Sequence, residues 1–189
     1  AWFFQLKEDA HGELRLLEVA PRIAGAMALH RVMGVNFPLL SLYEQERIPV
    51  SILINPAPVR LDRALVNRYE ARLDYQEVYV DLDDTLIFKG RVNDELVRFL
   101  YQAFNAGKRL VVLTRHAGDP QDTLRRHRLA GLFDEVIHLQ HGEPKAGAIR
   151  TASAILIDDS FRERQEVQRA TGISTFDGSM LELLLSERG

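Results

Sequence analysis

The sequence contains no cysteine, and this absence excludes two kinds of structure. Without thiols the chain can form neither a disulfide framework nor a thiolate zinc site. A protein without disulfides suits a reducing compartment, so we expect the cytoplasm as its location.

The chain also lacks a large charge excess and a long hydrophobic run. Its net charge is −3, so no broad field that would attract nucleic acid or a membrane surface is expected. The most apolar window, residues 23–42, is interrupted by His30, Arg31 and Asn36, and the first residues lack the pattern of a signal peptide. With 46% hydrophobic and 27% charged residues, we expect a soluble globular protein without a membrane role.

One short basic cluster, residues 125–128, is the sole candidate for contact with nucleic acid. No aromatic residues are interleaved with it and no known binding motif accompanies it. On a helix its side chains spread over several faces, so we favour a solvated surface over a nucleic-acid site.

One stretch organises the rest of the chain: the apolar run 78–80 ends in Asp81, Asp83 and Asp84. A strand covered on both faces of a parallel sheet is continuously hydrophobic, and acids at its carboxyl end lie where such sheets bind ligands. Asp81 and Asp83 point the same way along an extended chain. Neighbouring carboxylates repel unless a cation such as Mg²⁺ lies between them. A plain acidic turn after a strand is the alternative.

Three further features lie downstream of this stretch. They are two apolar strand patterns that end in polar residues and a lysine that opens a helical segment: residues 109–113 before Thr114, residues 154–157 before Asp158 and Asp159, and Lys145. Together with the Asp81 stretch, this set resembles the four motifs of the haloacid dehalogenase superfamily of aspartate-nucleophile phosphohydrolases, in the same order. The resemblance covers about residues 76–189.

The alternation of elements predicts an α/β fold with a doubly wound, mostly parallel, Rossmann-like sheet. The resemblance places the strand before Asp81 in its middle. Helices are expected over residues 94–105, 121–129, 160–170 and 179–187, and further strands over residues 135–139 and 173–176. From Asp83 to Thr114, and again from Thr114 to Lys145, there are 31 positions, which leaves no room for a large cap domain. We therefore expect a capless site that is open to solvent.

The resemblance implies a role for each motif residue. Asp81 is expected to be the nucleophile that forms an aspartyl-phosphate, and Asp83 the general acid and base. Thr114 is expected to hold phosphoryl oxygens, and Lys145 to neutralise charge and bridge to Asp81. Taken alone, Thr114 is an ordinary strand end and Lys145 a solvated lysine.

The resemblance also implies a Mg²⁺ site. Its expected ligands are the side chains of Asp81 and Asp159 and the backbone carbonyl of Asp83. Asp158 is expected to contribute directly or through water. The alternative for the acidic pair is that one of its members caps the next helix.

Other residues near these motifs have weaker assignments. Arg115, His116 and Lys89 lie on loops that should rim the crevice, and they are candidates for substrate contacts. Glu163 either supports the metal shell or is an exposed helix acid. Asp84 is expected to be solvated and Thr85 to bond the backbone of its turn.

Residues 1–75 form a second, smaller α+β unit in our interpretation, before the hydrolase-like domain of residues 76–189. Strands are expected over residues 2–8, 13–20 and 48–55, helices over residues 23–33 and 39–46, and a charged linker or surface helix over residues 60–70. The hairpin and the residues after it resemble the carboxy-terminal edge of an ATP-grasp domain. Glu18 and Arg22 match that family's metal and phosphate residues, but Ala20 replaces an asparagine, and we expect a structural role for both. The unit is interpreted as the tail of a larger ATP-grasp–phosphatase fusion or as a remnant kept for packing.

The sequence thus predicts a Mg²⁺-dependent phosphatase acting on a phosphomonoester. The alternatives are a non-catalytic scaffold domain of an ATP-grasp ligase fusion, and a phosphotransferase that uses the same residues. An oligomer or an ATP-grasp partner is expected to cover the open site.

Overall fold

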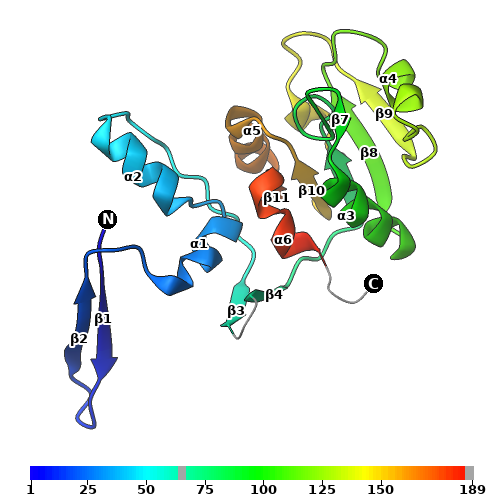
Figure 1. Ribbon diagram of the computed structural model, residues 1–189. Coiled ribbons are helices and arrows are strands. Elements are labelled where there is room, and N and C mark those ends of the chain that lie inside the picture. Colours follow the sequence, from blue (N-terminus) through cyan, green and yellow to red (C-terminus); the bar gives the residue numbers. More distant parts are fainter. Residues whose placement is uncertain (64–66, 186–189) are drawn as a thin grey trace.

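A five-stranded parallel sheet forms the centre of the larger unit (Figure 1). The computed structural model describes residues 1–63 and 67–185. The strand order is β11-β10-β5-β8-β9, and every neighbouring pair is parallel. The bounds are β5 Glu77–Val80, β8 Arg109–Thr114, β9 Glu135–His138, β10 Ala154–Ile157 and β11 Ser174–Phe176. The predicted doubly wound α/β fold is confirmed, with β5 in the middle.

Helices cover both faces of this sheet. The bounds are α3 Asp94–Asn105, α4 Pro120–Arg126, α5 Phe161–Thr171 and α6 Leu181–Leu184, with a 3₁₀ turn, η2, over Lys145–Ala148. Val78 and Val80 pack with α3, α4 and α6, whereas Tyr79 packs with α5 on the other face. This division follows from the alternation of side chains along a strand.

Local signals explain where these helices begin and end. The side chain of Asn93 accepts a hydrogen bond from the Leu96 N–H at 3.1 Å and caps α3, as the sequence predicted. The helix predicted over residues 121–129 is shorter, because α4 ends at Arg126 and Arg128 takes a left-handed conformation with φ 60°. The last helix begins at Gly178 as a 3₁₀ turn and continues as α6, while residues 186 and 187 of that prediction lie outside the described residues.

The first elements of the chain are an antiparallel hairpin and two short helices. Their bounds are β1 Phe3–Glu8, β2 Leu14–Ala20, the 3₁₀ turn η1 Gly25–Met27, α1 Ala28–Val32 and α2 Phe37–Gln45. The helix predicted over residues 23–33 begins later than expected, because Ala24 is extended. α2 begins after Asn36, whose side chain accepts from the Leu39 N–H.

Two predictions for the segment before β5 are wrong. Residues 48–55 form no strand, because no other strand of the described chain lies beside them to pair, and Ile48, Val50, Ile52 and Ile54 stay exposed. The charged region forms a hairpin instead of a linker or helix: β3 Val59–Arg63 pairs antiparallel with β4 Asn67–Ala71. Residues 64–66 of that region lie outside the described residues.

The first 75 residues attach to the sheet domain through three kinds of contact. Val32 belongs to the same hydrophobic cluster as β5, and Tyr69 packs against that cluster. The buried side chain of Asn55 accepts a hydrogen bond of 2.8 Å from the backbone N–H of Thr175 on the edge strand β11. Arg31 donates to the Ser179 carbonyl at 2.9 Å and pairs with Glu182.

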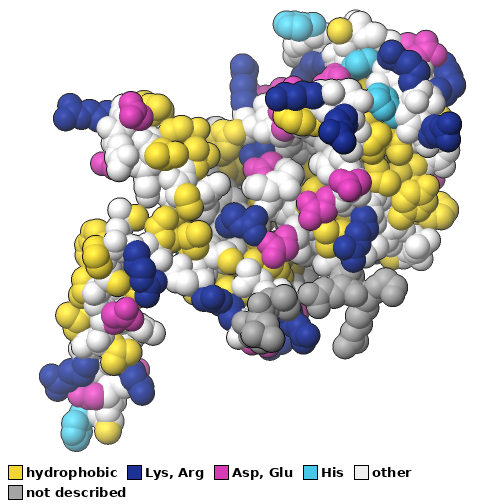
Figure 2. All heavy atoms as spheres, viewed as in Figure 1, with side chains coloured by type: hydrophobic (Ala, Val, Ile, Leu, Met, Phe, Trp, Pro, Cys, Tyr) yellow, Lys and Arg dark blue, Asp and Glu magenta, His cyan; other side chains and the backbone are white. Residues whose placement is uncertain are grey.

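The β1–β2 hairpin projects away from these contacts (Figure 1). Its large apolar side chains are exposed, and hydrophobic atoms gather on it and on α2 in Figure 2. Within the described part of the chain, no helix is long and apolar enough to cross a lipid bilayer.

Candidate active site

The candidate site lies where the chain's crossovers change direction in the sheet. β5 and β10 are adjacent, but β5 leads through α3 to β8 on one side and β10 leads through α5 to β11 on the other. Open α/β sheets bind ligands in the crevice at the carboxyl ends of such strands. Asp81 follows β5 and the pair Asp158-Asp159 follows β10, so three carboxylates from distant segments meet there.

These three carboxylates are close enough to share one cation. Asp81, Asp158 and Asp159 each offer an oxygen atom, and these atoms all lie within 4.8 Å of one another. Asp81 and Asp158 are buried while Asp159 is exposed, so the group opens to solvent on one side. A set of carboxylate oxygens with room for water fits the preference of Mg²⁺.

Lys145 is buried beside two of these carboxylates. Its Nζ donates to Asp81 Oδ1 at 2.7 Å and to Asp158 Oδ2 at 2.6 Å. Only 4% of its side chain is exposed, so the alternative of a solvated lysine is wrong. One buried lysine bound to two buried carboxylates, with Asp159 beside them, leaves the group negatively charged, and a buried excess charge is costly unless a counter-ion binds.

Burial and the neighbouring charges both shift the pKa values of Asp81 and Lys145. Burial raises the pKa of Asp81 to about 6, while the charge of Lys145 lowers it and that of Asp158 raises it further. Burial acts to lower the pKa of Lys145, but the charges of Asp81 and Asp158 outweigh it and the pKa is raised. The lysine therefore stays charged, and Asp81 becomes a carboxylate near neutral pH.

Thr85 holds Asp159 by two hydrogen bonds. Its hydroxyl donates to Asp159 Oδ1 at 3.2 Å and accepts from the Asp159 N–H at 2.9 Å. The sequence predicted only a turn role for Thr85. The expectation that an acid of the pair caps the next helix is also wrong, because Ser160 is the N-cap of α5, while Asp158 Oδ1 accepts from the Ser160 N–H.

Three successive residues at the end of β8, Thr114 to His116, each make hydrogen bonds in or beside the site. Thr114 Oγ1 accepts from the His116 N–H at 3.1 Å, which leaves the hydroxyl hydrogen of Thr114 free to donate. Arg115 donates to Glu163 Oε1 at 2.9 Å and to the carbonyl of Glu143. His116 turns toward Asp83, so neither Arg115 nor His116 points freely outward. Glu163 is a cleft residue and not a solvated helix acid.

An open cleft of about 280 Å³ joins these residues. Its lining consists of the motif residues, residues next to them in the sequence, and Glu163: Asp81, Asp83, Asp84, Thr114, Arg115, Lys145, Asp158, Asp159, Ser160 and Glu163. The structure thus brings together every motif residue that the sequence suggested. Their roles in a reaction remain predictions.

Lys89 lies outside this cleft, on a small flap. The flap is the hairpin β6 Ile87–Phe88 with β7 Arg91–Val92, and its turn has left-handed φ angles of 49° at Lys89 and 74° at Gly90. Lys89 and Phe88 border a hollow of about 430 Å³ that shares Asp84 with the cleft. The cleft and the flap hollow are thus neighbours at Asp84, and substrate contact by Lys89 stays a prediction.

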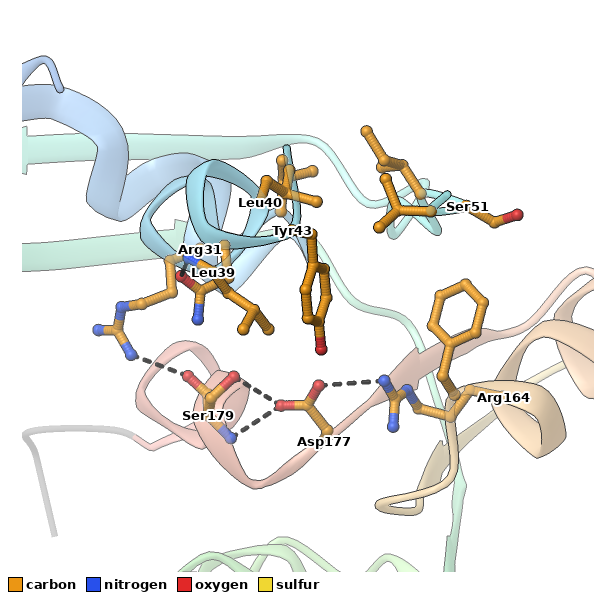
Figure 3. A pocket seen from close by; sticks show the side chains of 14 residues that line it. Arg31, Leu39, Leu40, Tyr43, Ser51, Arg164, Asp177 and Ser179 are labelled. Atoms are coloured by element: carbon orange, nitrogen blue, oxygen red, sulfur yellow. Dashed lines mark hydrogen bonds and ion pairs between the residues drawn. The ribbon is translucent and has the colours of Figure 1, made fainter. Parts of the chain in front are cut away.

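A second hollow, of about 350 Å³, lies between α2 and the sheet domain (Figure 3). Arg164 donates to Asp177 Oδ2 at 3.1 Å inside it, and the Tyr43 hydroxyl points toward the same carboxylate. Arg164 also donates to the carbonyl oxygens of Asp158 and Asp159, at 2.6 and 2.8 Å. Because its charged groups bind one another, we interpret this hollow as the junction between the two units.

Two other features suggested by the sequence, the pair Glu18 and Arg22 and the basic cluster of residues 125–128, do not line the cleft. Glu18 and Arg22 pair with each other at 3.7 Å at the exposed end of the hairpin, and their structural role stays a prediction. In the basic cluster, Arg125 pairs with Asp122 and Arg126 donates to Thr123 Oγ1. Both arginines are thus engaged with the polar residues of their own helix.

Comparisons with known proteins match the two segments separately. Residues 2–59 match the family described as ATP-grasp in the biosynthetic pathway with Ter operon. Among curated protein sequences, none matches the chain. The family match agrees with the ATP-grasp resemblance suggested by the sequence. Solved structures similar to the chain include haloacid dehalogenase-like hydrolases.

Three of these structures show how sequence identity, coverage and TM-score vary among the matches. A haloacid dehalogenase-like hydrolase from Streptococcus pneumoniae is 13% identical, covers 60% of this chain and 92% of its own, and gives a TM-score of 0.45. An uncharacterised protein from Corynebacterium glutamicum is 20% identical, with 53% and 82% covered and a TM-score of 0.42. The 3-deoxy-D-manno-octulosonate 8-phosphate phosphatase of Moraxella catarrhalis, solved with magnesium and phosphate ions, is 15% identical, with 59% and 84% covered and a TM-score of 0.38.

Proposed function

We propose that this protein is a Mg²⁺-dependent phosphatase that hydrolyses a phosphomonoester through an aspartyl-phosphate on Asp81. The observation that carries the proposal is the group of three carboxylates, two of them bound to the buried Lys145, at the point in the sheet where the crossovers change direction. Such a group is unfavourable by itself, and it becomes favourable when it binds a cation and the anion that the cation attracts. Asp83 and Thr114 line the same cleft, where general acid and phosphate-binding groups are needed.

In this mechanism Asp81 and Asp159 would hold Mg²⁺, with the Asp83 carbonyl and Asp158 as further donors. Bound there, the ion would neutralise the charge of the phosphoryl group. A carboxylate oxygen of Asp81 attacks phosphorus, and the bond from phosphorus to the ester oxygen breaks. Asp83 gives its proton to that leaving oxygen. Lys145 and the Thr114 hydroxyl hold the phosphoryl oxygens during the transfer.

A water molecule then attacks the same phosphorus atom and transfers a proton to Asp83. The bond from phosphorus to the Asp81 oxygen breaks, and inorganic phosphate leaves. Asp81 is again a carboxylate and Asp83 is again protonated, so the cycle is balanced. An alcohol in place of water would make the protein a phosphotransferase, and the ratio of the two products measures that alternative.

The division of the chain is part of the proposal. We assign catalysis to residues 76–189 and packing to the ATP-grasp-like residues 1–75, in a cytoplasmic protein. The open cleft supports a partner or a second copy that covers it. The flap hollow supports contact between Lys89 and the leaving group, whereas Arg115 and His116 would act through Glu163 and Asp83.

The test is phosphate release from p-nitrophenyl phosphate and a panel of sugar and nucleotide monophosphates, with Mg²⁺ and with EDTA. We expect metal-dependent release by the wild type and by Asp94→Asn, which removes an exposed carboxylate on α3. Asp81→Asn should release no phosphate while keeping its fold. Turnover by Asp81→Asn above a few per cent would remove Asp81 as the nucleophile. A folded wild type that neither releases phosphate nor binds Mg²⁺ would favour the scaffold alternative.

A further inference from the structure

The carboxylate of Asp83 has a single partner in the described part of the chain. His116 Nδ1 lies 2.9 Å from Asp83 Oδ1 and 2.9 Å from Oδ2. The Asp83 side chain is 54% exposed, whereas the imidazole is only 18% exposed. A carboxylate that would otherwise rotate in solvent is thus held by a ring that the protein packs.

The other side of the ring is anchored in the protein. His116 Nε2 lies 3.0 Å from Thr123 Oγ1 on α4, and Thr123 is buried. The backbone is fixed as well, because the His116 N–H donates to Thr114 Oγ1 and the His116 carbonyl lies 2.8 Å from His138 Nε2. The ring therefore has little freedom to turn away from Asp83.

The contacts on the two sides of the ring favour one tautomer. Nδ1 lies 2.9 Å from both oxygens of the Asp83 carboxyl group, an arrangement that suits a hydrogen on Nδ1 donating to that group. With the hydrogen on Nδ1, Nε2 can accept from the Thr123 hydroxyl, whose oxygen accepts from Arg126 at 2.9 Å.

We propose that His116 is a positioning residue that fixes the carboxyl of Asp83 at the leaving-group side of the cleft. The inference rests on the proposed function, because it gives Asp83 the general acid role. A general acid must stay within hydrogen-bond reach of the oxygen that it protonates, and a loosely held one transfers its proton less often. His116 itself touches neither the phosphoryl group nor the nucleophile.

A positioning role predicts unequal losses of activity on two kinds of ester, whereas a purely structural role predicts equal losses. Esters with a poor leaving group, such as β-glycerol phosphate, need the proton from Asp83, whereas p-nitrophenyl phosphate needs it little. For His116→Ala we expect kcat on β-glycerol phosphate to fall by about 10-fold to 100-fold, a share of what general acid catalysis contributes. On p-nitrophenyl phosphate we expect a loss below about 3-fold, with KM unchanged for both esters.

Two further variants separate the two sides of the ring. The amide nitrogen of asparagine stands as many bonds from Cα as Nδ1 does, and that of glutamine as many as Nε2. His116→Asn keeps a donor for Asp83 and should recover most of the activity on β-glycerol phosphate. His116→Gln can reach Thr123 but not Asp83, and it should behave like His116→Ala. In the Asp83→Asn background, removing His116 should cost nothing more, because it acts through Asp83.

A readout without turnover completes the test. Long-range ¹H–¹⁵N NMR of the imidazole should show a hydrogen on His116 Nδ1, and Asp83→Asn should shift that signal. A His116 ring in the Nε2–H form, or equal losses on both esters, would overturn the inference while leaving the phosphatase assignment intact. A wild type that hydrolyses neither ester would overturn the proposed function, and the positioning role with it.

Discussion

Thr85 and Asp159 are joined by two reciprocal hydrogen bonds, although 74 positions separate them in the sequence. The hydroxyl of Thr85 accepts from the backbone and donates to the side chain of the same aspartate. It therefore fixes both the loop after β10 and the direction of the one exposed carboxylate in the acidic cluster.

Thr85→Val should weaken Mg²⁺ binding, because it keeps the shape of the side chain and loses both hydrogen bonds. Losses of this kind around a metal ligand amount to roughly 10-fold to 100-fold in affinity. We expect the Mg²⁺ concentration for half-maximal phosphate release to rise by about 10-fold, with nearly normal kcat at saturating Mg²⁺. Thr85→Ser retains the hydroxyl and should stay near the wild type. An unchanged Mg²⁺ dependence in Thr85→Val would refute the role.

The stability of the metal-free protein should depend on pH through Asp81. The pKa of Asp81 is raised from 3.8 to about 6 in the folded state, so between these values the folded state binds more protons than the unfolded state. The free energy of unfolding attributable to Asp81 should therefore fall as pH rises from about 4 to about 6, by roughly 2 to 3 kcal/mol. Urea unfolding in EDTA across this range measures it. Asp81→Asn lacks the term, so parallel profiles for the two proteins would contradict the prediction.

Lys145→Met should lower the stability of the metal-free protein, because it leaves Asp81 and Asp158 buried without their shared cation. Removing one partner of a buried ion pair costs about 3 to 5 kcal/mol. We expect a clear drop in melting temperature in EDTA, partial recovery with Mg²⁺, and turnover close to zero. Lys7→Met, at an exposed lysine on β1, is the matched control. A melting temperature equal to that of the control would show that Lys145 does not stabilise the two buried carboxylates.

Asn55→Ala should loosen the attachment between the first unit and the sheet. The substitution leaves the backbone N–H of Thr175 without its acceptor, and an unsatisfied buried donor costs about 1 to 3 kcal/mol. Gln168→Ala, which removes an exposed hydrogen bond to the Ile54 carbonyl at the same junction, should cost less than about 0.5 kcal/mol. Urea titrations of both variants measure the difference. Equal costs would mean that burial at Asn55 is not what matters.

The parts of the fold that could be predicted are those with local signals. The continuous apolar runs before Asp81, Thr114 and Asp158 all proved to be buried parallel strands, since both faces of such strands are covered. Asn93 marked the start of α3 because a side-chain cap lies next to the helix that it stabilises.

The wrong predictions came from patterns whose outcome depends on a partner. Alternation of apolar and polar residues in 48–55 suits a strand, but a strand needs a neighbour, and the described chain offers none there. In β3 and β4 apolar and polar residues also alternate, but most of the polar residues are charged, and the segment therefore resembled a linker or surface helix. Leu61 and Tyr69 pair across the hairpin. A count of alternation in that segment would have found it.

The contacts between site residues could not be predicted from the sequence. The motifs indicated which residues approach the cleft, but the bonds from Arg115 to Glu163 and from His116 to Asp83 span 48 and 33 positions. No local pattern encodes such a contact, because it depends on how the loops after different strands pack against one another. The sequence suggests Arg115 and His116 as candidates for substrate contact, and in the structure each contacts a protein carboxylate, while Arg115 also lines the cleft.

The central place of β5 has a consequence for the order in which the protein opens. It is hydrogen-bonded to β8 and β10, one on each edge, and both of its faces are packed. Its amide hydrogens can exchange with solvent only when the whole sheet opens. The β1–β2 hairpin, which has one partner per strand and exposed apolar side chains, can open by itself. In deuterated water β5 should be the last element to exchange and the first hairpin the earliest. The exchange of β5 would then report global unfolding, and that of the hairpin would report local opening.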